Sequence, residues 1–124
     1  MSYTILKITH LTGLALVFMG LAGILAGSSS GNASLKSRWL FHVAHGLGLL
    51  MLITSGIALV VQLGQMGGDM HPLPGWVKAK FGIWLLAGGA MVLAARLSRF
   101  AGLVLIFFTA LAATAAWLAI AKPF

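Results

Sequence analysis

The sequence predicts an all-α integral membrane protein, an up-down-up-down four-helix bundle with short loops. Composition is the first observation: of 124 residues, 60% are hydrophobic and only 7% are charged. A soluble domain has roughly a quarter of its residues charged. This chain therefore has too few polar side chains to cover a water-soluble globule, and we expect the lipid bilayer to be its main surrounding.

The second observation is that polar breaks divide the chain into four apolar runs, at about 3–27, 39–63, 76–97 and 100–121. Each has the roughly 20 residues that a helix needs to cross the hydrocarbon core. The first run is longer than the apolar segment of a secretory signal, so we expect it to be retained as a span. Short connections place successive helices antiparallel. The sequence thus predicts one transmembrane domain over residues 1–124.

The net charge of +7 arises from eight basic residues and a single acid, Asp69. Because the basic residues lie near the ends of the apolar runs, topology and lipid headgroup contact explain them better than nucleic acid does. No nucleic-acid partner is expected.

The positive-inside rule gives an expected orientation. Lys36 and Arg38 flank the first connection, and Arg96 and Arg99 flank the third. Basic residues gather on the cytoplasmic side, which puts both termini on the periplasmic side of a bacterial inner membrane. An equal number of lysines lies towards the opposite side and opposes this assignment: Lys7, Lys78, Lys80 and Lys122.

Several kinds of chemistry are excluded by composition. The chain has no cysteine, which removes disulfides, thiolate ligands and covalently attached haem. One acidic residue leaves no pair of carboxylates for hydrolytic acid–base catalysis. Any enzymatic activity would therefore depend on a cofactor.

His10 is the deepest histidine of the first run. It lies about five residues before the midpoint of that run, or roughly 7 to 8 Å from the bilayer centre. Gly13, Val17 and Gly20 share its helix face. A nitrogen donor beside glycines suits a flat macrocycle that holds iron. The pattern indicates a site for such a macrocycle, with His10 as the ligand to iron and Gly13 and Gly20 beside the ring, although close helix packing is the favoured explanation of the glycines.

Lys80 opens the third run at the same depth as His10, about 9 Å from the bilayer centre. Two interpretations apply. The amine snorkels to the headgroups along its aliphatic stem, or it stays buried as a second iron ligand or proton relay. Trp84, one turn deeper on the same face, either walls such a site or packs against lipid.

His42 and His45 are three residues apart on one face of the second run. His42 lies near the interface, whereas His45 is deeper and is a further candidate for the second ligand. By helical rise, His45 and His10 differ by about 16 Å along the membrane normal. In straight helices of similar tilt, one iron cannot take both.

The second connection offers a different ligand set. "QMGGDMH" at 65–71 contains Met66, Asp69, Met70 and His71, soft and borderline donors that suit copper. This segment predicts, as an alternative, a copper-handling or small-solute transport accessory.

Four stretches carry a resemblance to known membrane proteins: "LKITHL" at 6–11, "HGLGLLMLITSGIAL" at 45–59, "GWVKAKFGIWLLAGGAMVL" at 75–93 and "AIAKP" at 119–123. The chain resembles the SirB family of small four-helix membrane proteins and, more distantly, the HemJ (protoporphyrinogen oxidase) and CopD families. The HemJ resemblance implies roles in haem b binding and activity for His10 and Lys80. The SirB resemblance matches His45 without assigning it a role.

The chain also departs from the oxidase pattern, because the segment 90–96, "AMVLAAR", has no histidine late in the third run. Haem binding is therefore a firmer expectation than protoporphyrinogen oxidation.

Together these features predict a haem b membrane protein with a redox role, either electron transfer or haem-linked oxidation of the HemJ-like type, with quinone or porphyrin as partner. The alternative from another class is a cofactor-free scaffold or assembly subunit that uses its glycine faces to bind a membrane partner or a second copy.

Overall fold

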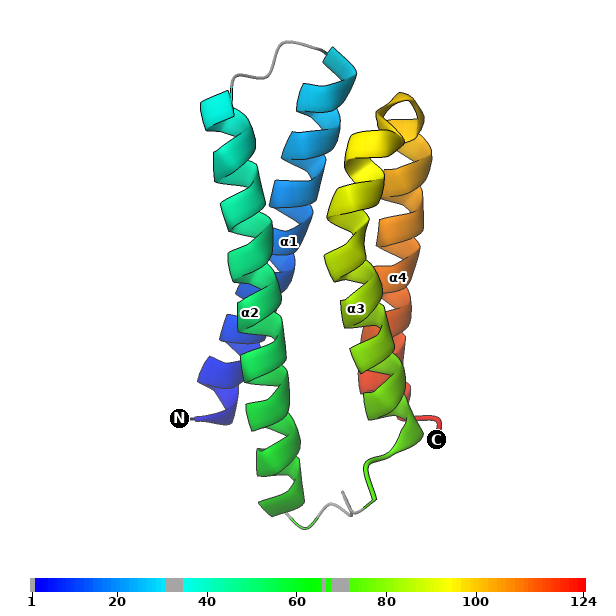
Figure 1. Cartoon of the computed structure of the whole chain (residues 1–124). Coiled ribbons are helices and arrows are strands. Elements are labelled where there is room, and N and C mark those ends of the chain that lie inside the picture. The colour runs from blue at the N-terminus through cyan, green and yellow to red at the C-terminus, as the bar shows by residue number, and fades with distance from the viewer. Residues whose placement is uncertain (1, 31–34, 66, 68–71) are drawn as a thin grey trace.

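A computed structural model describes residues 2–30, 35–65, 67 and 72–124. It contains α1 (Tyr3–Ser30), α2 (Leu35–Gln65), α3 (Gly75–Arg96), the short 3-10 turn η1 (Ser98–Phe100) and α4 (Ala101–Ala121). Successive α-helices run antiparallel, and the first and last described residues lie at the same end of the bundle (Figure 1). The predicted all-α four-helix bundle is confirmed.

All four long helices are long and apolar enough to cross a membrane, over Tyr3–Gly27, Trp39–Gln65, Gly75–Ala94 and Ala101–Ala121. The chain is therefore a multi-pass membrane protein by the length and composition of its helices. The first two helices extend beyond the predicted spans at the first connection. Serine, leucine, lysine and arginine are tolerated in helices, and residues 28–30 and 35–38, which lie outside the predicted spans, are helical.

The helices form two hairpins, α1 with α2 and α3 with α4, and the α1–α2 pair is the more closely packed. Close packing of α1 on α2 depends on glycine. A Cβ atom at Gly20 would lie 2.5 Å from the Phe41 carbonyl oxygen and 2.7 Å from the His45 Cβ atom, and one at Gly13 would lie 3.0 Å from the Gly48 carbonyl oxygen. Only a residue without a side chain allows this approach.

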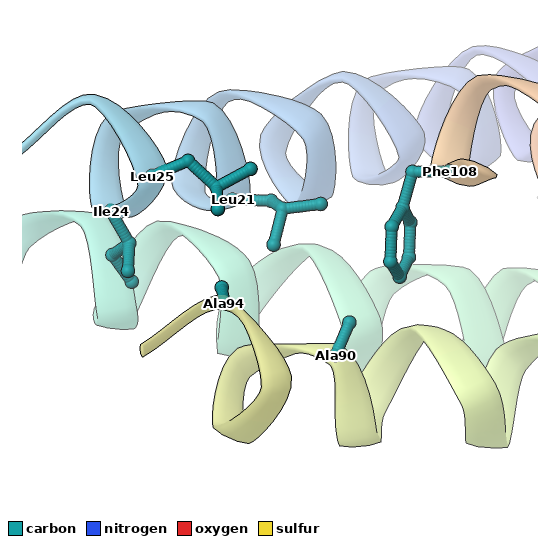
Figure 2. Close-up of a cluster of buried hydrophobic side chains, with 6 residues drawn as sticks. All are labelled: Leu21, Ile24, Leu25, Ala90, Ala94 and Phe108. Atoms are coloured by element: carbon teal, nitrogen blue, oxygen red, sulfur yellow. The ribbon is translucent and has the colours of Figure 1, made fainter. Parts of the chain in front are cut away.

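The two hairpins meet in an apolar cluster near the first connection. Leu21, Ile24 and Leu25 of α1 point towards Ala90 and Ala94 of α3 (Figure 2). Phe108 of α4 completes the cluster. This packing holds the two hairpins together at the end near the first connection. The space between the hairpins towards the other end forms the cavity described below.

Candidate functional site

A cavity of about 1050 Å³ lies between the hairpins and is lined by all four long helices. Ligand sites in proteins usually measure about 300–1000 Å³, so this one has room for a large ligand. Its walls are mainly aliphatic and aromatic side chains. Among the described lining residues, the ionisable or amide side chains are His10, Gln65, Lys78 and Lys80.

His10 and Lys80 lie in the wall of this one cavity, in agreement with the equal depth expected from the sequence. Lys80 is half-buried, and it is close enough to His10 for the two groups to interact electrostatically. Since Asp69 is the single acidic side chain of the chain and lies outside the described residues, no carboxylate side chain in the described part pairs with Lys80. The site is therefore basic at its polar end.

A hydrogen bond to α2 orients the His10 ring. The Nδ1 atom of His10 lies 2.8 Å from the Oγ atom of Ser55. Ser55 is buried, with 3% of its surface exposed. Its hydroxyl donates to the Met51 carbonyl oxygen one turn earlier. A hydroxyl has one hydrogen; with that hydrogen on the Met51 carbonyl oxygen, the neutral tautomer that satisfies the contact carries its hydrogen on Nδ1 and its lone pair on Nε2.

Two neighbours of Ser55 shape the same contact. The His10 ring lies over Gly56, where an added Cβ would be 3.4 Å from Cε1. The Leu52 backbone carbonyl lies in the same turn of α2, close to the imidazole. The ring edge that faces α2 thus meets acceptors, which favours a hydrogen on that edge and a free lone pair on the other.

Trp84 also lines the cavity, as one of its two sequence interpretations proposed. Its indole N–H donates to the Leu49 carbonyl oxygen at 2.9 Å, and its ring stacks on Phe81 with 5.6 Å between centroids. These contacts fix the ring in the wall and join α3 to α2. Trp84 therefore shapes the cavity on the side of Lys80.

His45 lies elsewhere, outside the cavity lining and with 2% of its surface exposed. Its Nδ1 atom is 3.0 Å from the Val17 carbonyl oxygen of α1, and its Nε2 atom is 3.1 Å from the Ala87 carbonyl oxygen of α3. A neutral imidazole has one N–H and donates to one of these carbonyls, whereas an imidazolium would donate to both. His45 joins three helices and presents no nitrogen to the cavity.

The glycines assigned to the cofactor face the neighbouring helix instead. Gly13 and Gly20 pack against α2 and do not line the cavity. The close-packing interpretation accounts for both positions. Helical periodicity had placed them on the face of His10, but the turn of α2 that approaches this face fills it.

Of the remaining sequence candidates, only His42 lies among the described residues, and it is not part of the site. His42 is exposed on α2. Met66, Asp69, Met70 and His71 of the expected copper segment lie outside the described residues. Within the described residues there is no group of three or more His, Cys, Asp or Glu side chains that could hold a metal ion.

Haem places fewer demands on the protein, because the porphyrin supplies four nitrogen ligands and the chain only one or two. His10, with a lone pair on Nε2 and a hydrogen bond on Nδ1, is the arrangement that a metal-binding histidine requires. The apolar walls and the basic polar end suit a macrocycle that carries carboxylates. The residues present thus fit a haem.

Sequence reasoning missed Ser55. The signal was its position: Ser55 lies ten residues before the end of α2 and His10 seven residues after the start of α1, which brings the two to similar levels in an antiparallel pair.

Comparison with known proteins gave no match to a family model, to a curated protein or to a solved structure. The assignment of function therefore depends on the site itself.

Proposed function

We propose that this protein binds haem b in the cavity between its two helical hairpins, with the His10 Nε2 atom as axial ligand to iron. The observation that carries the proposal is the His10–Ser55 hydrogen bond at the wall of the cavity. It directs the hydrogen to Nδ1 and keeps the lone pair on Nε2.

Lys80 supplies the second polar function of the proposed site. Its ammonium stands near His10 without a carboxylate partner in the described part of the chain. A carboxylate of the cofactor would neutralise this charge, and a deprotonated amine could serve as second ligand or proton relay. His45 is not part of the proposed site, because both its nitrogens face backbone carbonyl oxygens.

Bound haem supplies one-electron chemistry, so the proposed role is membrane electron transfer or haem-linked oxidation of the HemJ-like type. The chain contributes a fixed imidazole, a basic group and walls that exclude water. Exposed apolar side chains such as Leu11, Ile57 and Phe81 line the cavity within the spans. A partner dissolved in the bilayer, a quinone or a porphyrin, fits this surrounding.

The expected location is a bacterial inner membrane with both termini on the periplasmic side, following the basic residues of the first and third connections. In that orientation His10 and Lys80 lie in the periplasmic half of the bilayer. Cysteine accessibility at introduced terminal residues tests the orientation directly.

The test of haem binding is expression with a supply of haem, purification in detergent and measurement of the haem to protein ratio. We expect a Soret band in the wild type and its loss in His10→Ala. His42→Ala is the matched control, because His42 is exposed on α2 and lies outside the cavity. A colourless wild type, or an unchanged spectrum in His10→Ala, would reject haem ligation by His10.

One observation favours the scaffold alternative. Gly82 and Gly89, seven residues apart on α3, have no heavy atom within 4 Å of an added Cβ, so this face of α3 is open to a partner helix or a second copy of the chain. Purification of a colourless protein with a stoichiometric membrane partner would support that function over haem binding.

A further inference from the structure

We infer that Ser55 is a positioning residue that sets the tautomer of His10, holding the hydrogen on Nδ1 so that Nε2 presents its lone pair to the cavity. The inference deepens the proposed haem site and rests on it for its functional consequence. The tautomer itself is a property of the protein without ligand and can be measured separately.

The hydrogen-bond inventory of the two side chains carries the first step. Ser55 Oγ donates to the Met51 carbonyl oxygen, its partner four residues earlier. The other acceptor within reach of its hydrogen, the Leu52 carbonyl oxygen, is 3.4 Å away. Both are acceptors only. With the hydroxyl hydrogen on the backbone, the contact with Nδ1 at 2.8 Å uses the imidazole hydrogen.

Burial carries the second step. Only 3% of the Ser55 surface is exposed, so water does not compete for its hydroxyl oxygen. In an apolar surrounding a donor without an acceptor is costly, whereas a water-exposed ring could exchange tautomers freely. The bond therefore fixes both which nitrogen carries the hydrogen and the rotation of the ring.

The neighbouring Thr54 is a natural comparison for Ser55, because both hydroxyls donate to a backbone carbonyl oxygen of α2. Its hydroxyl donates in the same way, to the Leu50 carbonyl oxygen at 2.8 Å. Thr54 is exposed on the outer face of α2 and does not line the cavity. Thr54 and Ser55 thus form a matched pair of hydroxyls, of which one meets a histidine.

His45 supplies an internal contrast. Its two nitrogens face carbonyl oxygens, which only accept, whereas the partner of His10 Nδ1 is a hydroxyl that could in principle donate. Which nitrogen of His10 carries the hydrogen therefore depends on where Ser55 donates its own hydrogen. Removal of the hydroxyl should change His10 and leave His45 unchanged.

The experiment is nitrogen NMR of ¹⁵N-histidine-labelled protein in detergent without haem, followed by titration with hemin. In the wild type we expect His10 in the Nδ1–H form, with Nε2 unprotonated. In Ser55→Ala we expect a mixture of tautomers and a hemin affinity lower by about ten- to a hundredfold, as for other partners of metal-binding histidines. Ser55→Thr should restore both, and Thr54→Ala should change neither.

Three results would overturn the inference: Nε2–H as the main form of wild-type His10, a Ser55→Ala variant that keeps both its tautomer and its affinity, or an equal effect of Thr54→Ala. A wild type with the expected tautomer but no affinity for hemin would instead reject the proposed function and leave the role of Ser55 in orienting His10 in place. Circular dichroism of each variant reports whether it has folded.

Discussion

The imidazole of His10 on α1 and the hydroxyl of Ser55 on α2 meet at 2.8 Å at the wall of the cavity between the two hairpins. The two residues are 45 positions apart in the sequence. The contact joins α1 to α2, the two helices of the first hairpin. It holds the His10 ring against α2. Lys80 of α3, in the second hairpin, lines the same cavity.

His45 is expected to stabilise the bundle without touching the cofactor. His45→Phe removes the contacts with the Val17 and Ala87 carbonyl oxygens. A neutral imidazole makes one of these hydrogen bonds, so at about 0.6 kcal/mol for an average hydrogen bond between membrane helices we expect a loss of stability of about that size. The measurement is unfolding in SDS followed by circular dichroism, with His42→Phe as control. Band positions of bound haem should not move, and a change of axial ligation in His45→Phe would contradict the assignment.

Lys80 is expected to tune the site through its charge. A cation beside haem favours the ferrous form, so Lys80→Met should lower the reduction potential of the bound iron while the apolar stem keeps the packing. Redox titration followed by absorbance measures the shift. Lys78→Met is the control, because Lys78 lines the same cavity but is more exposed. Equal reduction potentials in wild type and Lys80→Met would indicate that the Lys80 ammonium reaches the lipid headgroups instead of the haem.

Filling the cavity should exclude the ligand without unfolding the chain. Ala115 lines the cavity on α4, whereas Ala113 is exposed on the same helix and does not line it. Ala115→Trp is therefore expected to reduce hemin binding by at least tenfold, and Ala113→Trp to leave it unchanged. Hemin titration of the two variants gives the comparison. Similar affinities would show that the ligand occupies some other place.

Gly20 is expected to be required for folding and not for cofactor contact. In Gly20→Ala the new Cβ would meet the Phe41 carbonyl oxygen at 2.5 Å, and overpacking of this kind costs about 1–3 kcal/mol. Gly82→Ala, with open space around it, should be neutral. SDS unfolding compares the two. A stable Gly20→Ala variant that has lost only hemin affinity would return Gly20 to the cofactor site.

The sequence was sufficient for the architecture because apolar run length decides whether a helix crosses a bilayer. The four spans differ from the helices by a few residues at their ends, most at the first connection, where α1 continues to Ser30 and α2 begins at Leu35. Helical rise also placed His10 and Lys80 at one level, and both line one cavity. Depth along a span is local information, so a sequence carries it well.

Which residues of two helices face each other is not local information. Periodicity showed that Gly13 and Gly20 share a face with His10, but not that α2 lies against that face. Ser55 was missed for the same reason, since a hydroxyl in a membrane helix usually bonds its own backbone and gives no sign of a second partner. The cavity itself is lined by all four long helices, so no single run of residues specifies it.

The most direct test of the account is imidazole rescue of a His10→Gly variant. This substitution removes the proposed ligand and leaves a space for the free base, while Ser55 and the cavity walls remain. The account predicts that the variant has lost the wild-type haem spectrum and that added imidazole restores it, with no such effect on His42→Gly. A His10→Gly protein that shows the wild-type spectrum before imidazole is added would contradict the central claim that His10 binds the iron.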